Sequence, residues 1–232
     1  MIKKHIPNTI TCLNLAAGCV AIILAFQGQL QSAALFILAA AGFDFLDGMA
    51  ARLLKAYSPM GKELDSLSDV VSFGVAPAML LFTSIKSGAL STGASEAWAW
   101  MVLLLPVASA LRLAKFNLDE RQTTVFLGLP TPANGLFWAF TAGFGLDQWL
   151  TAPLHPAYFL PVILLLAGLM VSEVPMFSLK IKHLKAKENR PIYLFLLGCL
   201  PLILLLGWSG LAACIAWYIL LALIVSASWK LS

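Results

Sequence analysis

The chain has few charged residues for its length. Of its 232 residues, 11% are charged and 60% are hydrophobic, whereas a typical soluble domain carries about 25% charged and about 45–50% apolar residues. This composition excludes an ordinary soluble globular domain. Apolar runs of about 20 residues, the length that crosses a bilayer, recur along the whole sequence. The chain is therefore predicted to be a polytopic membrane protein.

Cysteine and histidine are also scarce. The four cysteines lie inside apolar segments without a CxxC spacing, and the three histidines are scattered without an HExxH pattern. These absences argue against a disulfide framework and against a zinc site. The basic residues lie at the ends of apolar segments and form no stripe interleaved with aromatic residues, so no nucleic-acid partner is expected.

Eight membrane spans are predicted from the apolar segments. Their approximate bounds are 6–26, 31–53, 63–85, 96–116, 133–150, 157–179, 191–206 and 210–229. With the N-terminus inside, fourteen of the fifteen basic residues fall on the cytoplasmic side, and the outer loops hold only Lys86. Because cytoplasmic loops are enriched in Lys and Arg, both termini are predicted to be cytoplasmic. The expected fold class is an all-α membrane helix bundle that forms one domain, 1–232.

Four aspartates gather in the second and third of these spans. Asp44 and Asp47 stand three residues apart, and Asp65 and Asp69 stand four apart, so each pair lies on one helix face. An aspartate at the centre of a spanning helix costs about 2.5–3.5 kcal/mol on insertion scales, so such acids normally serve a site. Four carboxylates facing one another would repel, and divalent cations are the obvious counter-charge.

The chemistry of these acids favours magnesium or manganese. Hard oxygen ligands suit Mg²⁺ or Mn²⁺ and not zinc, and Mg²⁺ is typically held by a few carboxylates plus substrate phosphate oxygens. Two such ions about 3.5–4 Å apart can clamp a pyrophosphate. Gly48 and Ala51 lie on the Asp44 face, four and seven residues on, and their small side chains leave room for a nucleotide. Close helix packing is the alternative interpretation of these two residues.

The stretch 44–69 resembles the signature of the CDP-alcohol phosphotransferase family. The pattern has no mismatch and reads Asp44-x2-Asp47-Gly48-x2-Ala51-Arg52-x8-Gly61-x3-Asp65-x3-Asp69. The resemblance implies that two divalent ions are held by the four aspartates, the last of which, Asp69, also serves as general base. It further implies donor contacts from Gly48, Ala51, Arg52 and Gly61, although Arg52 could instead orient the catalytic acids.

Five short motifs resemble one branch of this family, the membrane phosphatidylserine synthases. In order, they are IPNTITCLNLAAG from Ile6, GKELDSLSDVVSFGVAPA from Gly61, LRLAKFN from Leu111, FLGLPTPA from Phe126 and LMVSEVPMFSLK from Leu169. The resemblance implies transfer of a phosphatidyl group from CDP-diacylglycerol to the hydroxyl of L-serine, with release of CMP. It also implies a homodimer in a prokaryotic inner membrane, with the active site facing the cytoplasm. A six-helix core over about 1–180 would be followed by two additional spans over about 190–229.

Serine requires a receptor for its carboxylate near the metal centre. Arg112 and Lys115 stand three residues apart at the cytoplasmic end of the fourth span and can point toward the same mouth, and Arg suits a planar carboxylate. The branch commonly has Arg where this chain has Lys115, so bidentate recognition is doubtful there. The alternative interpretation is that Arg112 and Lys115 anchor the end of the span at the membrane surface. Polar residues near helix ends can likewise serve as helix caps, with no role in binding a substrate. Further candidates for headgroup, nucleotide or serine contacts are Asn8, Thr11, Asn14 and Asn117.

Two other features have open roles. The run from Gly128 to Pro132 must leave helix, because Pro130 and Pro132 restrict the residues before them to extended conformations. It forms either a wall of the acceptor pocket or a plain turn. Glu173 lies inside the sixth predicted span, where it pairs with a basic residue or hydrogen-bonds within the bundle.

Two rival functions compete with serine transfer. A glycerol 3-phosphate or inositol phosphate acceptor would favour a denser basic pocket than Arg112 and Lys115 provide. A divalent-cation transporter would place acids near the midplane on broken or symmetry-related helices, whereas here they cluster in one hairpin and the two halves show no repeat. Transfer to serine is therefore the preferred prediction.

Overall fold

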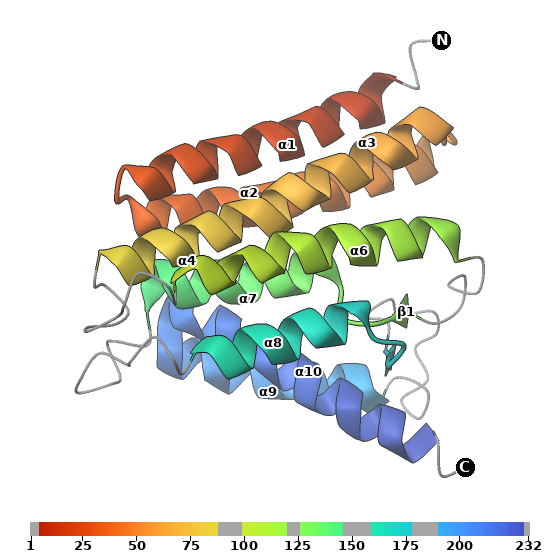
Figure 1. Cartoon of the computed structure of the whole chain (residues 1–232). Helices are drawn as coiled ribbons and strands as arrows, with labels where there is room; N and C mark the ends of the chain where they lie inside the picture. Colours follow the sequence, from red (N-terminus) through yellow and green to blue (C-terminus); the bar gives the residue numbers. More distant parts are fainter. Residues whose placement is uncertain (1–4, 88–98, 120–125, 146–158, 178–189, 230–232) are drawn as a thin grey trace.

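The computed structural model describes residues 5–87, 99–119, 126–145, 159–177 and 190–229. Within these ranges, long helices lie side by side in one bundle (Figure 1). The α-helices are α1 (His5–Phe26), α2 (Leu30–Leu53), α3 (Pro59–Asp69), α4 (Ala76–Lys86), α6 (Leu104–Leu118), α7 (Thr131–Phe144), α8 (Phe159–Val171), α9 (Arg190–Leu206) and α10 (Gly210–Trp229). Shorter helical turns are η2 (Val70–Val75), η3 (Trp100–Leu103) and η6 (Gly207–Ser209).

The all-α fold class is confirmed, and a helix occupies each of the eight predicted span ranges. Five segments of the described chain are long and apolar enough to cross a membrane: His5–Phe26, Leu30–Leu53, Pro59–Lys86, Trp100–Leu118 and Arg190–Ser226. The last of them contains α9 and most of α10. The apolar helix α8 is shorter than these five.

Two predicted span ends are wrong, since α7 ends at Phe144 inside the predicted span 133–150, and α8 also ends early. The apolar run predicts helix throughout 157–179, but α8 ends at Val171 and the chain then runs extended through Pro175. Proline disfavours the helical conformation of the residue before it, which explains the early end. The basic residues predicted to be cytoplasmic at Lys3, Lys4, Arg121, Lys180, Lys182, Lys185, Lys187 and Lys230 lie outside the described residues.

The third predicted span is a continuous helical segment with an irregular middle. Ser58 caps its N-terminus, since Gly61 N donates to Ser58 Oγ at 3.0 Å. Pro59 occupies the first turn, where its missing N–H removes no helical hydrogen bond. Between α3 and α4, η2 is a π-helix that begins directly after Asp69. Such π-helical insertions are frequent at functional sites.

Helix α1 approaches this segment closely. A Cβ added to Gly18 would lie 2.5 Å from Ser72 Oγ and 2.9 Å from Ser72 Cα, so only glycine permits the contact. Ser72 Oγ donates to Asn14 O at 3.0 Å, and Ser68 Oγ donates to Thr11 O at 3.3 Å. Small residues and interhelical hydrogen bonds of this kind hold helices together in membranes.

A short antiparallel pairing connects the start of α7 with the segment after α8. β1 (Phe126–Leu127) pairs with β2 (Pro175–Met176), and Gly128 N donates to Val174 O at 2.9 Å. Gly128 has φ +74°, and a Cβ there would lie 2.6 Å from a backbone carbonyl oxygen of α8. The run that begins at Gly128 therefore leaves helix as predicted and leads into Thr131, the first residue of α7.

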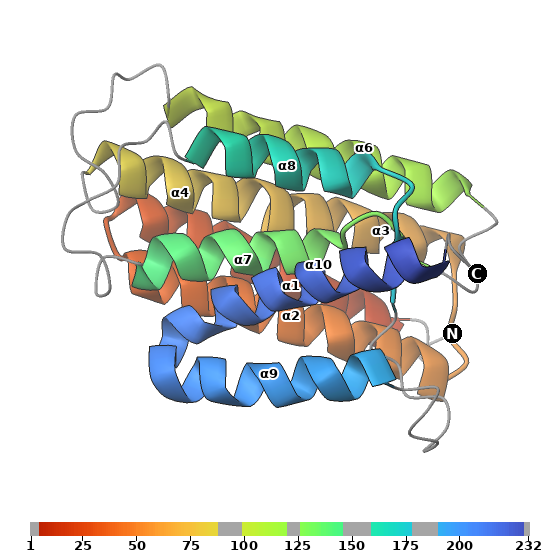
Figure 2. The same cartoon turned by 90° about the horizontal axis from the view of Figure 1, so that it is seen from below.

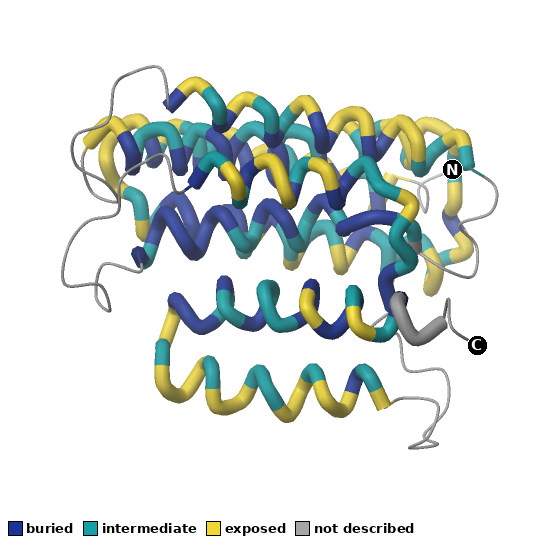
Figure 3. Tube along the Cα trace, turned by 60° about the horizontal axis from the view of Figure 1, so that its bottom comes forward, coloured by how far each residue is buried: buried dark blue, intermediate teal, exposed yellow. Residues whose placement is uncertain are grey.

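The two ends of the described chain lie at the same end of the bundle, on opposite sides of it (Figure 1). The start of α1 and the end of α10 lie at the same end of the bundle (Figure 2). Burial differs between the helices, and α9 carries mostly exposed positions along its length (Figure 3).

Candidate active site

Three carboxylates from two helices meet at one point. Asp44 and Asp47 project from α2 and Asp65 projects from α3, and one oxygen from each lies within 4.8 Å of the others. The connection between the two helices spans only residues 54–58, which brings their acidic faces together. Asp47 is buried, and the other two are half-buried. The structure thus brings these three predicted metal ligands together.

Helix α1 supplies hydrogen-bond donors to the acids. Thr11 Oγ1 donates to Asp47 Oδ2 at 2.6 Å, and Asn14 Nδ2 donates to Asp69 Oδ1 at 3.3 Å. Both donor residues are buried. Hydrogen bonds to a charged acceptor are stronger than neutral ones, so α1 orients two of the four carboxyl groups.

Asp69 adjoins the three-carboxylate group without joining it. It lies one turn beyond Asp65 on α3, is 6% exposed, and is outside the set of oxygens that meet within 4.8 Å. It remains within electrostatic range of Asp44 and Asp65. Asp69 therefore differs in position from the three converging carboxylates. A general base that is not one of the main metal ligands would need such a position.

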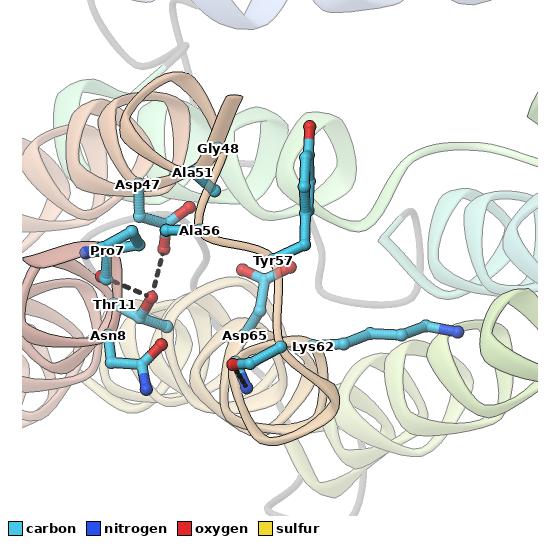
Figure 4. Close-up of a pocket in the computed structure, with 12 residues that line it drawn as sticks. Pro7, Asn8, Thr11, Asp47, Gly48, Ala51, Ala56, Tyr57, Lys62 and Asp65 are labelled. Atoms are coloured by element: carbon cyan, nitrogen blue, oxygen red, sulfur yellow. Dashed lines mark hydrogen bonds between the residues drawn. The ribbon is translucent and has the colours of Figure 1, made fainter. Parts of the chain in front are cut away.

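A cavity of about 210 Å³ opens beside Asp47 and Asp65 (Figure 4). Helices α1, α2 and α3 and the turn between α2 and α3 all contribute to its wall. In Figure 4, Lys62 extends away from the acids, and its Nζ donates to Asn117 O at 3.0 Å. The lining residues are Pro7, Asn8, Thr11, Asp47, Gly48, Ala51, Ala56, Tyr57, Ser58, Gly61, Lys62 and Asp65.

The small residues of the signature have different surroundings. Outside its own helix, no described atom lies within 4 Å of a Cβ built on Gly48, so this glycine faces open space. At Gly61 an added Cβ would lie 3.0 Å from both Asn8 Oδ1 and Ser58 Oγ, so close packing alone accounts for that glycine. Arg52 is exposed near the end of α2 and does not line the cavity.

Arg112 is a buried cation beside the acids. Its Nη1 donates to Thr131 Oγ1 at 3.3 Å, and its Cζ lies 5.3 Å from the centre of the Phe116 ring. It is within electrostatic range of Asp69 and Asp44. Its Nε has no hydrogen-bond partner among the described residues. A buried guanidinium with unused donors is suited to bind an anionic group.

Lys115 does not share this position. Its Nζ donates to Val171 O at 3.0 Å and lies 4.0 Å from Glu173 Oε1. Of the two alternatives for Glu173, this contact favours pairing with a basic residue, but Glu173 lies beyond the end of α8 and not inside a spanning helix as predicted. Arg112 turns into the bundle while Lys115 reaches across its surface, so the structure does not bring the two cations to one mouth.

Asn117 ties the end of α6 to α3. Its Nδ2 donates to Ser66 Oγ at 2.9 Å, and its carbonyl oxygen accepts from Lys62. Both contacts lie near the cavity wall to which Lys62 belongs. The residue is therefore close to the site, with its side chain engaged in helix packing.

The donor set fits a hard divalent cation. The converging groups are all carboxylates, and Asp65 Oδ1 is buried without a hydrogen-bond partner among the described residues. An unpaired polar atom is costly in a low-dielectric interior, and a cation at this point would satisfy it. Oxygen-only ligation is preferred by Mg²⁺ and Mn²⁺.

Two features of the site were missed by reasoning from the sequence. Thr11 and Asn14 are predicted to contact a headgroup or nucleotide, whereas the structure also makes them partners of the acids. Their three-residue spacing on an apolar helix was the available signal. The hydrogen bond from Arg112 to Thr131 was also missed. The only feature of the sequence that singled out Thr131 was its place directly after Pro130.

Comparison with known proteins agrees with this geometry. The model of the CDP-alcohol phosphatidyltransferase family matches residues 4–172, a region that contains all four aspartates and Arg112. Three relatives are each named CDP-diacylglycerol–serine O-phosphatidyltransferase. The relative from Bacillus subtilis (strain 168) is 42% identical over 57% of this chain and 72% of its own length.

The other two relatives are mycobacterial. The one from Mycobacterium tuberculosis (strain ATCC 25618 / H37Rv) is 34% identical over 96% of this chain and 74% of its own length. The one from Mycobacterium leprae (strain TN) is 36% identical over 74% of this chain, and the match spans 57% of that relative. With its acidic site inside the matched region, the chain belongs to the CDP-alcohol phosphatidyltransferase family.

Proposed function

We propose that this protein transfers the phosphatidyl group of CDP-diacylglycerol to the hydroxyl of L-serine, giving phosphatidylserine and CMP. The observation that carries the proposal is a buried arginine, Arg112, within electrostatic range of Asp69, beside the acidic site of the family. The acidic site suits the diphosphate of the donor, and the arginine suits a carboxylate on the acceptor. The names of the three relatives describe the same reaction.

The acids would hold two divalent ions, Mg²⁺ or Mn²⁺. Asp44, Asp47 and Asp65 would be the main ligands, and Asp69 would contact the metal site from its edge. The bound ions would neutralise the negative charge of the donor diphosphate. Thr11 supports this role, because its hydrogen bond to Asp47 holds that carboxyl group in a fixed orientation.

The cavity beside the acids would receive the nucleotide end of the donor. Gly48 offers open space there, and the cavity wall also includes Ala51, Asn8, Thr11 and Gly61. Arg52, exposed near the end of α2, would reach the donor phosphates from the solvent side. The lipid chains of the donor would remain in the bilayer.

Asp69 would be the general base. Asn14 donates to its Oδ1 and leaves the remaining oxygen lone pairs to accept a proton. Asp69 takes the proton of the serine hydroxyl as the serine oxygen attacks the phosphorus that carries the diacylglycerol. The bond from that phosphorus to the CMP oxygen breaks, and CMP leaves with the electron pair. No covalent enzyme intermediate is needed.

Arg112 would bind the serine carboxylate. Its unpartnered Nε and its burial beside Asp69 support this assignment, because the carboxylate would then lie near the base that activates the hydroxyl. For Lys115 and Asn117, a contact with serine remains a prediction. The side chain of Lys115 donates a hydrogen bond to Val171 O of α8, and that of Asn117 donates to Ser66 Oγ of α3.

We further propose eight membrane spans with both termini in the cytoplasm, in a prokaryotic inner membrane. The start of α1 and the end of α10 lie at the same end of the bundle, which supports an even number of crossings. The exposed apolar surface of α9 and α10 supports contact with lipid. A homodimer, expected from the family resemblance, belongs to the same proposal.

The test is release of CMP by the purified full-length protein in detergent. CDP-diacylglycerol is supplied with Mg²⁺ or Mn²⁺ and with serine, glycerol 3-phosphate or an inositol phosphate in separate reactions. We expect CMP release in the reaction with serine and in neither of the other two reactions. A chelator should abolish this release. Release with a phosphorylated acceptor would contradict the serine assignment. Metal uptake by vesicles that contain the protein, without CMP release, would favour a transporter.

A further inference from the structure

Tyr57 is the only aromatic residue among the described residues that line the cavity beside Asp47 and Asp65. Its side chain is not packed into the protein, since the residue is 69% exposed. Figure 4 shows its ring edge-on, with the hydroxyl group pointing away from Asp65 and one face turned toward α2, which carries Gly48 and Ala51. An aromatic face is thus directed across the cavity.

The backbone before Tyr57 is fixed by the end of α2. Ala56 N donates to Ala51 O at 2.9 Å, and Lys55 N donates to Arg52 O at 3.3 Å. These two hydrogen bonds form the Schellman motif that ends many helices. Lys55 has φ +50°, a left-handed conformation that favours glycine and is costly for lysine. Backbone strain of this kind persists where the surrounding structure holds it, and it is found at ligand sites.

The backbone after Tyr57 is fixed by the start of α3. Ser58 follows directly and caps α3, since its Oγ accepts a hydrogen bond from Gly61 N at 3.0 Å. Ser58 is extended, with φ −146° and ψ 148°, as expected for a residue that precedes a proline. Tyr57 is therefore a single residue between a closed helix end and a capped helix start. This turn holds the ring beside the cavity.

The part of the cavity wall on α2 carries small residues. No described atom outside its own helix lies within 4 Å of a Cβ built on Gly48, and the side chain of Ala51 is a single methyl group. The space beside this wall is therefore open, and the Tyr57 ring borders it. A flat heteroaromatic ring fits such a space, and stacking of a base on an aromatic side chain is a common source of affinity for nucleotides.

The order of the groups in the donor agrees with this placement. In a CDP ester, the ribose separates the base from the diphosphate. Asp47 and Asp65, which belong to the acids that suit the diphosphate, lie on the cavity wall, and the Tyr57 ring extends away from Asp65. A nucleotide with its diphosphate at these acids therefore brings its base to the part of the cavity that Tyr57 borders.

We propose that the ring of Tyr57 stacks on the pyrimidine base of the donor nucleotide. The inference rests on the proposed function, because it assumes that the cavity receives the nucleotide. Stacking uses the face of the ring, so Tyr57 supplies affinity through its ring and not through its hydroxyl group. The competing explanation is that the ring anchors the turn at the lipid interface, where tyrosine is enriched in membrane proteins.

The experiment measures binding of CDP by calorimetry, with the purified full-length protein in detergent and Mg²⁺. Tyr57→Leu removes the aromatic face, so the Kd of CDP should rise about five- to thirtyfold. Tyr57→Phe keeps the face, and its Kd should stay within about twofold of the wild type. Met60→Leu is the matched control, because Met60 is 70% exposed near the same turn and does not line the cavity. It should bind CDP like the wild type.

Inorganic pyrophosphate separates stacking from damage to the acidic site, because it has no base. Tyr57→Leu should leave the Kd of pyrophosphate within about twofold of the wild type. Equal losses of affinity for CDP and pyrophosphate would overturn the inference, and so would an unchanged Kd for CDP, which would place the ring in the lipid interface.

The same measurements separate this inference from the proposed function. Wild-type protein that binds CDP but releases no CMP with serine would contradict the proposed function, while the expected difference between Tyr57→Leu and Tyr57→Phe would still support stacking. Failure of the wild-type protein to bind CDP would contradict the proposed donor together with the inference.

Discussion

Two segments of the bundle show opposite relations between hydropathy and burial. In Pro59–Lys86, the most apolar window of 18 residues has a mean hydropathy of 1.5, and 67% of that window is buried. In Arg190–Ser226, the corresponding window has a mean hydropathy of 2.2, and only 11% of that window is buried. In water the more apolar segment would be the more buried one. Here the order is reversed, which is consistent with lipid acting as the solvent of α9, whose positions are mostly exposed.

The contrast identifies what holds the buried segment in place. Lipid is as apolar as leucine, so helices in a membrane associate through close packing and hydrogen bonds. Pro59–Lys86 has both, since Ser68 and Ser72 donate to α1 and Gly18 permits the close approach. The side chains of the exposed leucines of α9 offer no hydrogen bond, and α9 is joined to α10 through its backbone, where Trp217 Nε1 donates to Leu194 O at 3.3 Å. The candidate metal site, which includes Asp65, therefore involves the less apolar of the two segments.

The largest expected effect of a substitution in the buried segment is at Asp69. Asp69→Asn removes the proposed base and should lower kcat by about 10²–10⁴, the usual contribution of general base catalysis. Binding of CDP-diacylglycerol should persist, measured by retention of labelled donor. Glu63→Gln is a matched control, because Glu63 is an exposed acid on the same helix. Turnover by Asp69→Asn within about tenfold of the wild type would remove the residue from the base role.

Arg112 and Lys115 test whether buried and exposed cations on one helix differ in function. Arg112→Ala should raise the KM for serine by about tenfold or more, since hydrogen bonds to charged groups contribute about 1.5–3 kcal/mol. Lys115→Ala should change it by less than about twofold, because surface ion pairs contribute little. Steady-state kinetics with each substrate varied in turn measures both values. Equal effects of the two substitutions would contradict the separation seen in the structure.

Thr11 tests the support that α1 gives to the acids. Thr11→Val removes the hydroxyl that donates to Asp47 while keeping the shape of the side chain. The metal concentration for half-maximal activity should rise about tenfold, the lower end of the effect of losing such an outer contact. Thr9→Val is the control, because Thr9 is exposed and donates only to a backbone oxygen of its own helix. An unchanged metal dependence would show that the hydrogen bond is dispensable.

Gly18 tests the close packing of the buried segment. Gly18→Val would force its side chain into Ser72 and should destabilise the fold by about 1–3 kcal/mol, the usual cost of overpacking. Gly42→Ala is the contrast, since no described atom outside its helix lies within 4 Å of an added Cβ there. The melting temperature in detergent should fall for Gly18→Val and not for Gly42→Ala. A similar melting temperature for both variants would contradict the close approach of α1.

The smallest effect is expected in the hairpin of α9 and α10. Leu204 on α9 is 76% exposed. Leu204→Ala should change stability by less than about 0.5 kcal/mol, as for other exposed positions. The same melting-temperature measurement checks it. A large loss of stability would mean that α9 is covered by another protein surface.

Local spacing explains most of what the sequence predicted correctly. Residues three or four apart share a helix face wherever the helix lies, so the spacing of Asp44 and Asp47 was enough to assign them to one site. The short connection between α2 and α3 then required Asp65 to meet them. The span ranges followed from apolar runs, which depend on composition alone.

The remaining features depend on which face of a helix turns inward. Arg112 and Lys115 have the same charge and nearly the same place in the sequence, yet one is buried and the other bonds to α8. The π-helix after Asp69 and the contact of Tyr218 with Phe177 also arise from packing between distant segments. Such pairings cannot be derived from one sequence, because no local rule selects the partner.

The order of the chain has a consequence for biosynthesis. Thr11 and Asn14 belong to the first helix, whereas the carboxylates that they serve, Asp47 and Asp69, come from later helices. As the ribosome makes the protein from its N-terminus, each of these acids emerges after its hydrogen-bonding companion. The two aspartates, whose burial in a membrane is costly, therefore follow a helix that already carries hydrogen-bond donors for them.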